Sequence, residues 1–110
     1  MKLDAATAVI PQEKLTRYLL SHEHPIGRFK ARFFASLGYT EAEWTRLADD
    51  LRSQHLSVDA EEASRTRFGR KFVITAPLTG PNGASASVCS VWIVREGESE
   101  PRFVTAYRGA

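Results

Sequence analysis

The segment just before residue 27 is the part of the sequence best suited to acid–base chemistry. It reads His22-Glu23-His24-Pro25-Ile26-Gly27 and precedes a stretch with helical periodicity. Histidine is the usual general acid or base in enzymes because it titrates near neutral pH. The free N–H groups of a helix N-terminus favour anions, and Gly27 would let a ligand or another backbone approach closely. We therefore expect His24 either to act as a catalytic acid or base or only to cap this turn. We expect no metal site, because His-Glu-His lacks an obvious third and fourth ligand.

A lysine falls at the apolar edge of the following segment. A helix over residues 26–37 would have an apolar arc of Ile26, Phe29, Phe33 and Leu37, widened by Phe34. Lys30 falls between Leu37 and Phe34, so its stem must run along the core and carry the ammonium to a rim or groove. Arg28 and Arg32 fall on the far side, where water should be. Two interpretations of Lys30 stay open: ordinary snorkelling, or a cation at the helix–sheet boundary that binds an anion.

The C-terminal third of the chain supplies polar and aromatic groups with the alternation of strands. In residues 102–107, Phe103, Thr105 and Tyr107 should share one face. Trp92, together with Phe103 or Tyr107, would offer a stacking surface for nucleic-acid bases. Such aromatic side chains more often belong to the core, and the alternation does not say which face of the sheet the helices cover.

Helical patterns come before strand patterns along the chain. We expect a first helix from Pro11, a second over residues 26–37 that stops at Gly38, and a third opened by a capping box at Thr40. The third helix should bury a stripe of Trp44, Leu47, Leu51 and His55. Strands are expected over residues 68–78, 85–95 and 102–107, with a turn at Pro81-Asn82-Gly83 and a weaker strand within residues 58–67. This order predicts an α+β fold, with two to three N-terminal helices packed on a three- to four-stranded antiparallel sheet.

Length and composition indicate one domain over residues 1–110. With 43% hydrophobic and 25% charged residues, the chain has the composition of an ordinary globular protein. The lone Cys89 excludes an internal disulfide and fits a reducing compartment. Neither a signal peptide nor a run of the ~20 apolar residues that a membrane span needs is apparent. We therefore expect a cytoplasmic protein that does not enter the membrane.

The net charge of +2 neither requires nor excludes a polyanionic partner. The distribution of charge is more informative, because basic residues fall in two clusters: Arg17, Arg28, Lys30 and Arg32, and then Arg65, Arg67, Arg70 and Lys71. Such segregation can create a local basic surface on a nearly neutral protein, or only solvated faces. No cofactor is expected, since the sequence has no Gly-rich phosphate loop and no Ser-His-Asp spacing.

The sequence resembles a family of small, uncharacterised bacterial domains that occur alone or at the C-terminal end of toxin-like proteins. The resemblance covers nearly the whole chain. It is carried by residues 14–20, by His24-Pro25-Ile26-Gly27-Arg28-Phe29-Lys30-Ala31-Arg32-Phe33-Phe34, by Leu37-Gly38, by residues 68–72 and 80–83, by Val91-Trp92 and by Pro101-Arg102-Phe103-Val104-Thr105-Ala106-Tyr107. The family itself implies no activity.

The helices-then-sheet order and the Thr-Ala-Tyr ending also look like the barnase, EndoU, colicin and RelE-type ribonuclease toxins. That similarity implies a general acid or base at His24, a phosphate-binding cation at Lys30, and substrate-positioning groups at Thr105 and Tyr107. Arg28, Arg70, Trp92 and Arg108 would then contact the substrate. In many such toxins the last motif ends in proline, whereas Arg108 follows Tyr107 here.

Two hypotheses of different classes follow. The first is a metal-independent endoribonuclease of the bacterial toxin type, with RNA as substrate and a cognate acidic antitoxin as partner. It requires His24, Lys30, Thr105 and Tyr107 to converge on one cleft. The second is a non-enzymatic antitoxin, immunity-type or adaptor protein, which an exposed apolar patch or a paired edge strand would favour. The sequence leaves the oligomeric state open.

Overall fold

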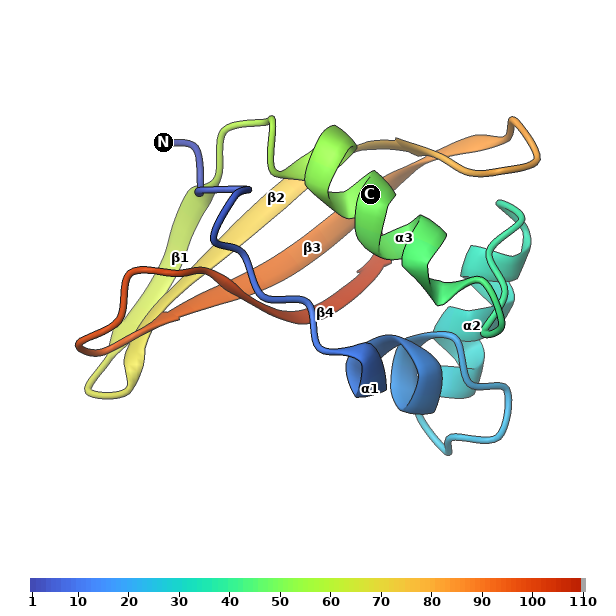
Figure 1. Cartoon of the computed structure of the whole chain (residues 1–110), viewed down its shortest axis with the longest axis horizontal. Helices are drawn as coiled ribbons and strands as arrows, with labels where there is room; N and C mark the ends of the chain where they lie inside the picture. Colours follow the sequence, from blue (N-terminus) through green and yellow to red (C-terminus); the bar gives the residue numbers. More distant parts are fainter. Residues whose placement is uncertain (110) are drawn as a thin grey trace.

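A computed structural model describes residues 1–109 of the chain, and in it the helices precede a four-stranded antiparallel sheet (Figure 1). The elements, in order, are α1 (Gln12–Lys14), η1 (Leu15–Leu19), α2 (Gly27–Ala35), α3 (Trp44–Asp50), η2 (Leu51–His55), β1 (Glu61–Thr66), β2 (Gly69–Thr79), β3 (Ser85–Arg95) and β4 (Arg102–Arg108). The elements η1 and η2 are single π-helical turns that continue α1 and α3. The predicted α+β fold is confirmed. Within residues 1–109 no helix is long and apolar enough to cross a membrane.

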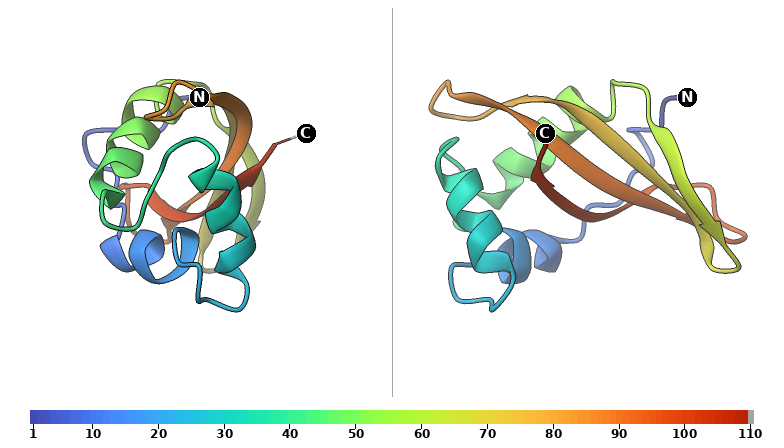
Figure 2. Two further views of the ribbon diagram at one scale, coloured as in Figure 1. Left: turned by 90° about the vertical axis from the view of Figure 1, so that its right-hand side faces the viewer. Right: turned by 180° about the vertical axis from the view of Figure 1, so that it is seen from behind.

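The strands pair in sequence order, β1-β2-β3-β4, each antiparallel to the next. The third predicted helix, present as α3 and η2, lies across one face of the sheet (Figure 1). Its stripe is buried as expected at Leu47, Leu51 and His55, while Trp44 is half-buried. Seen from behind, no helix lies in front of the strands (Figure 2). The core therefore lies between one sheet face and the segments that precede β1.

The helix α2 buries only part of the apolar arc that its sequence predicts. Ile26 is 64% exposed and Phe29 60% exposed, whereas the buried positions are Gly27, Ala31 and Phe34. Since α3 and η2 already occupy the sheet face, α2 lies at one end of the sheet, beside η1 (Figure 1). The expected apolar arc is therefore confirmed at Phe34 and Leu37, which are buried, and wrong at Ile26 and Phe29. The expected stop is confirmed, because Gly38 has a φ of 97°.

A β-bulge in β4 changes which of its side chains share a face. Trp92 pairs with Phe103 and Val91 with Thr105, so Val104 is an extra residue without a partner of its own. Phe103 consequently faces the core, where its ring lies 5.3 Å from that of Trp92, and Thr105 faces the other way. The predicted shared face of Phe103 and Thr105 is wrong for this reason.

Candidate functional site at the α2–β4 edge

Three side chains from separate elements meet where α2 and η1 approach the edge strand β4. The Lys30 ammonium on α2 donates to the Tyr18 hydroxyl oxygen at 2.5 Å and to Thr105 Oγ1 at 2.9 Å. The two hydroxyl groups lie 3.2 Å apart, so each of the three groups contacts the other two. All three side chains are half-buried. Lys30 is thus not simply snorkelling into solvent, because its charge is held by two hydroxyl groups and no carboxylate.

The position of Tyr18 depends on a glycine in the first turn of α2. A Cβ atom on Gly27 would lie 1.9 Å from the Tyr18 carbonyl oxygen, far inside contact distance. Only a residue without a side chain lets η1 and α2 approach this closely. Gly27 is predicted to allow a close approach, and in the structure the group that approaches it is the backbone of Tyr18.

The Lys30 charge changes the acidity of Tyr18. Burial raises the pKa of the Tyr18 phenol, but the hydrogen bonds from Lys30 and Thr105 and the nearby positive charge outweigh burial, so the net pKa lies below its ordinary value of 10.0. The ammonium also lies 5.0 Å from the centroid of the Tyr18 ring. A tyrosine whose phenolate is stabilised in this way is suited to proton transfer.

His24 caps the start of α2. Its Nδ1 accepts hydrogen bonds from the backbone N–H groups of Gly27, at 2.9 Å, and Ile26, at 3.1 Å. Because both partners are donors, Nδ1 must carry the lone pair, and the proton of the neutral ring lies on Nε2. The ring edge also packs on Tyr18, with centroids 5.0 Å apart. This geometry matches the second interpretation of His24, in which it caps the turn. Only the Nε2–H group is then free to face a ligand.

Tyr107 lies at the outer side of the same group. Its ring centroid is 5.8 Å from the Lys30 ammonium, and its side chain is 42% exposed. Tyr107 pairs with Cys89 across β3 and β4, and a hydrogen bond with the Cys89 thiol raises the pKa of Tyr107. This phenol therefore stays protonated at neutral pH and can donate or stack.

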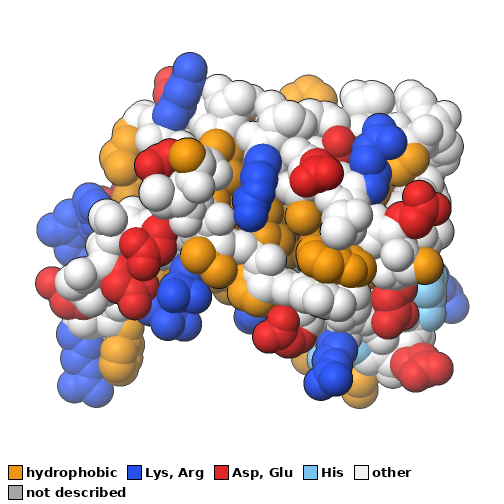
Figure 3. Space-filling model, in the orientation of Figure 1, with side chains coloured by type: hydrophobic (Ala, Val, Ile, Leu, Met, Phe, Trp, Pro, Cys, Tyr) orange, Lys and Arg blue, Asp and Glu red, His pale blue; other side chains and the backbone are white. Residues whose placement is uncertain are grey.

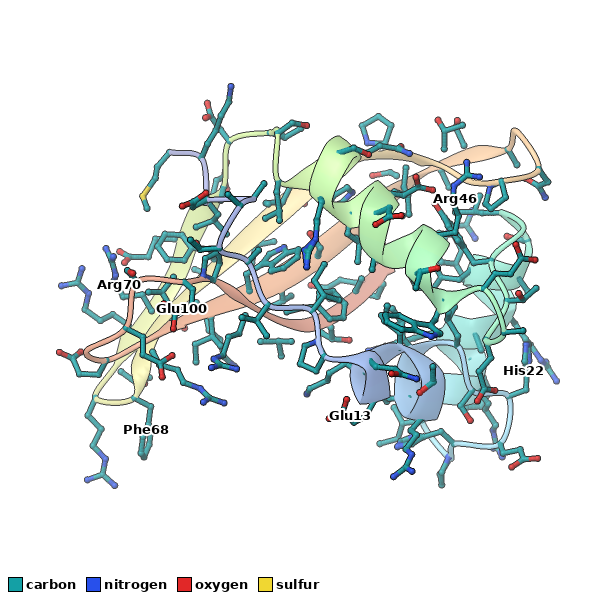
Figure 4. All side chains as sticks on the ribbon, in the orientation of Figure 1. Glu13, His22, Arg46, Phe68, Arg70 and Glu100 are labelled. Carbon is teal, nitrogen blue, oxygen red and sulfur yellow. The ribbon has the colours of Figure 1, made fainter. Side chains whose placement is uncertain are left out.

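The structure separates the remaining predicted site residues. Arg28 and Arg108 are exposed on α2 and β4, the elements that carry Lys30 and Tyr107. Trp92 is fully buried and donates its indole N–H to Ser90, so its predicted stacking on bases is wrong. Arg70 lies at the opposite end of the sheet from the loop of His22, as Figure 4 shows, and cannot share a cleft with Lys30.

The sequence does not indicate Tyr18 as a site residue. Its spacing with Leu15 and Leu19 places it on the inner stripe of the first helix, which indicates a core residue. Its hydroxyl group instead reaches past the core to Thr105, a residue 87 positions later in the chain. No local feature of the sequence predicts that contact. Within residues 1–109, no group of three or more His, Cys, Asp or Glu side chains is placed to hold a metal ion.

A family model described as "Domain of unknown function (DUF6883)" matches residues 2–110. The chain belongs to the DUF6883 family. The resemblance to a family of uncharacterised domains is confirmed at that level. A comparison of this DUF6883 domain with curated proteins found no match.

Among solved structures, this DUF6883 domain is similar to a chain of a contact-dependent growth inhibition toxin–immunity protein complex from Klebsiella pneumoniae 342. The TM-score is 0.69, and the alignment covers 92% of this chain and 99% of that chain. The two sequences are 16% identical, so the likeness establishes a shared fold.

Proposed function

We propose that this chain is one component of a toxin–immunity pair and acts in complex with a partner protein. The support is the likeness of its fold, over nearly the whole length of both chains, to a chain of a toxin–immunity complex. A complex of this kind needs a protein-binding surface. The exposed apolar side chains of Ile26 and Phe29 on α2 supply a candidate for it.

Within such a pair, one candidate is the toxic component, a metal-independent ribonuclease. The observation that carries this proposal is the contact of Lys30 with Tyr18 and Thr105, which joins a cation to a phenol of lowered pKa. Neither group has a carboxylate beside it to neutralise the charge, among the residues described.

In the proposed reaction the phosphodiester lies against the Lys30 ammonium, which stabilises the charge that develops on phosphorus. The Tyr18 phenolate takes the proton of the ribose 2′-hydroxyl, and the 2′-oxygen attacks phosphorus. The bond to the 5′-oxygen breaks, and that oxygen takes a proton from Lys30. Tyr18 then returns its proton to Lys30 through their hydrogen bond, which leaves a 2′,3′-cyclic phosphate and a 5′-hydroxyl group. Thr105 and Tyr107 hold the phosphate or ribose.

The test is cleavage of labelled RNA by the purified chain in the presence of EDTA. The proposal expects cyclic-phosphate ends from the wild type and loss of cleavage by about 100-fold or more in Lys30→Met and Tyr18→Phe. The matched control is Lys2→Met, since Lys2 is an exposed lysine outside the elements that carry Tyr18, Lys30 and Thr105. A folded wild type that leaves RNA intact would remove the ribonuclease proposal.

The second candidate is the non-enzymatic component, an immunity-type binding module. The observation that favours it is the exposure of Ile26 and Phe29, two large apolar side chains one helical turn apart at the start of α2. Its test is calorimetric titration with the protein encoded beside this chain, comparing wild type with Phe29→Ser. Tight binding that Phe29→Ser weakens, together with a wild type that does not cleave RNA, would establish this candidate over the first.

A further inference from the structure

We propose that the β1–β2 hairpin is a second site of this protein, which binds single-stranded RNA through its backbone and one stacked base. Arg70 lies far from the α2–β4 edge. Arg70 pairs with Val94 on β3, whereas Tyr107 pairs with Cys89. Cys89 and Val94 are five positions apart on β3, which is about 17 Å at ~3.3 Å per residue, so the hairpin is separate from the Lys30 group.

The hairpin carries more positively charged than negatively charged side chains. Residues 61–71 hold four cations, Arg65, Arg67, Arg70 and Lys71, against two carboxylates, Glu61 and Glu62. Every residue of β1 is exposed, so no part of this strand is held by a core. In the space-filling view, Lys and Arg side chains (blue) lie beside a hydrophobic side chain (orange) at this end of the molecule, and Asp and Glu side chains (red) lie next to them (Figure 3).

Two of these cations oppose each other directly across the strands. Arg65 and Arg70 are Cα partners, and like charges in such pairs destabilise a sheet. One carboxylate oxygen, Glu62 Oε1, lies 3.5 Å from Arg65 and 3.7 Å from Arg70 and so serves both. In residues 1–109 neither Arg67 nor Lys71 forms an ion pair. The surplus charge is what an anionic backbone would neutralise.

The tip of the hairpin supplies an aromatic surface. Phe68 is 66% exposed, and the Arg67 guanidinium lies 4.9 Å from the centroid of its ring. Figure 4 shows Phe68 pointing away from the body of the molecule. An exposed aromatic ring flanked by arginine is the arrangement on which unpaired bases stack. We take single-stranded RNA as the occupant because its phosphates would neutralise the cations while an unpaired base stacks on the ring.

A hollow of about 270 Å³ lies beside the hairpin, between it and the β3–β4 loop. Arg65, Arg70 and Arg95 line one part of it, and Glu96 and Glu98 line another. Glu98 is paired with Arg102 at 3.4 Å. The carboxylates of this loop would repel a phosphate, so we place the RNA backbone along Arg65, Arg67 and Arg70 and not along the loop.

The experiment measures binding of a fluorescent 2′-O-methyl oligoribonucleotide by anisotropy, over a range of salt concentrations. A 2′-O-methyl group cannot attack phosphorus, so binding is read without cleavage. We expect Arg65→Ala/Arg67→Ala/Arg70→Ala to lose about tenfold or more in affinity and to lower the slope of log Kd against log salt by about 2, at ~0.7 per phosphate contact. Phe68→Ala should lose about tenfold with an unchanged slope.

The control variant Lys2→Ala/Lys14→Ala/Arg17→Ala removes the same charge from exposed positions outside the hairpin. Equal weakening by the control and the hairpin variant would overturn the proposal, since only net charge would then matter. Hairpin variants that bind RNA normally but no longer bind the partner protein would also overturn it. Thermal melting of each variant checks that β1 is not lost.

This inference does not depend on cleavage, although it deepens the ribonuclease proposal. A wild type that binds the methylated RNA but never cleaves unmodified RNA would remove the ribonuclease and keep the hairpin site. A hairpin variant that cleaves with unchanged kcat and KM would remove the hairpin site and keep the ribonuclease.

Discussion

The Lys30 ammonium lies 2.5 Å from the Tyr18 hydroxyl oxygen, although the two residues belong to different helical elements. The ring of His24 packs against the same tyrosine, and Thr105 completes the group from β4. This relationship moves the candidate proton-transfer role from His24, where the sequence suggests it, to Tyr18. The predictions below test that reassignment and the packing that supports it.

The first prediction concerns the pH dependence of RNA cleavage. If the Tyr18 phenolate is the base, the rate should rise tenfold per pH unit and level off at the pKa of Tyr18, which lies below 10.0. Removing the Lys30 charge in Lys30→Met should move this limb towards higher pH as well as lower the rate. Ultraviolet absorbance of the phenolate provides a second measurement. A limb centred near neutral pH and abolished by His24→Asn would instead assign the base to His24.

The second prediction separates the two roles of His24. His24→Ala removes the acceptor for Gly27 and Ile26 and should lower the free energy of unfolding by ~1 kcal/mol. His24→Asn should restore most of that loss, because asparagine caps helices well, and should keep RNA cleavage within a few-fold of wild type. Chemical denaturation and RNA cleavage of both variants provide the measurement. Equal inactivity of two well-folded variants would mean that the imidazole takes part in the chemistry.

The third prediction concerns Gly27. A methyl group at this position would overlap the Tyr18 carbonyl oxygen, so Gly27→Ala should force η1 and α2 apart. We expect a loss of ~1–3 kcal/mol in the free energy of unfolding, as for other overpacked sites. Arg28→Ala, at the exposed neighbouring position, should change stability by no more than ~0.5 kcal/mol. Denaturant titration of both variants checks this, and a neutral Gly27→Ala would contradict the close approach.

The fourth prediction concerns the buried His55. Burial lowers the pKa of His55 below 6.5, and the Ala76 carbonyl only partly opposes this. Its Nδ1 contacts Ser90 Oγ at 2.7 Å, while its buried Nε2 has no partner for an added proton among the described residues. The unfolded chain therefore binds a proton that the folded chain does not.

It follows that the contribution of His55 to stability is present above pH ~6.5 and is lost as the pH falls, by at most ~1.4 kcal/mol per pH unit. Urea unfolding between pH 5 and 7.5 measures this slope. The slope should decrease in His55→Asn and stay unchanged in His22→Asn, which alters an exposed histidine. Identical slopes in all three proteins would show that His55 is not the group responsible.

The sequence by itself determined the order and type of the elements, because these depend on contacts within a few residues. The period-two pattern of β2 and β3, the left-handed stop at Gly38 and the buried stripe ending at His55 are all local features. The position of Lys30 at an apolar edge was also predictable, since one helical turn suffices to define it. The sequence therefore points to Lys30 and, through the resemblance to ribonuclease toxins, to Thr105, but not to Tyr18, which contacts both.

Only the tertiary structure decided which faces meet. The face that α2 buries depends on α3 already covering the sheet, and the side to which Thr105 points depends on one extra residue at Val104. A bulge of a single residue reverses the alternation of a strand, and the alternation itself carries no sign of it. The contact of Tyr18 with Thr105 joins residues 87 positions apart. Such contacts form only when whole elements pack, because their geometry is set by the shape of the assembled core.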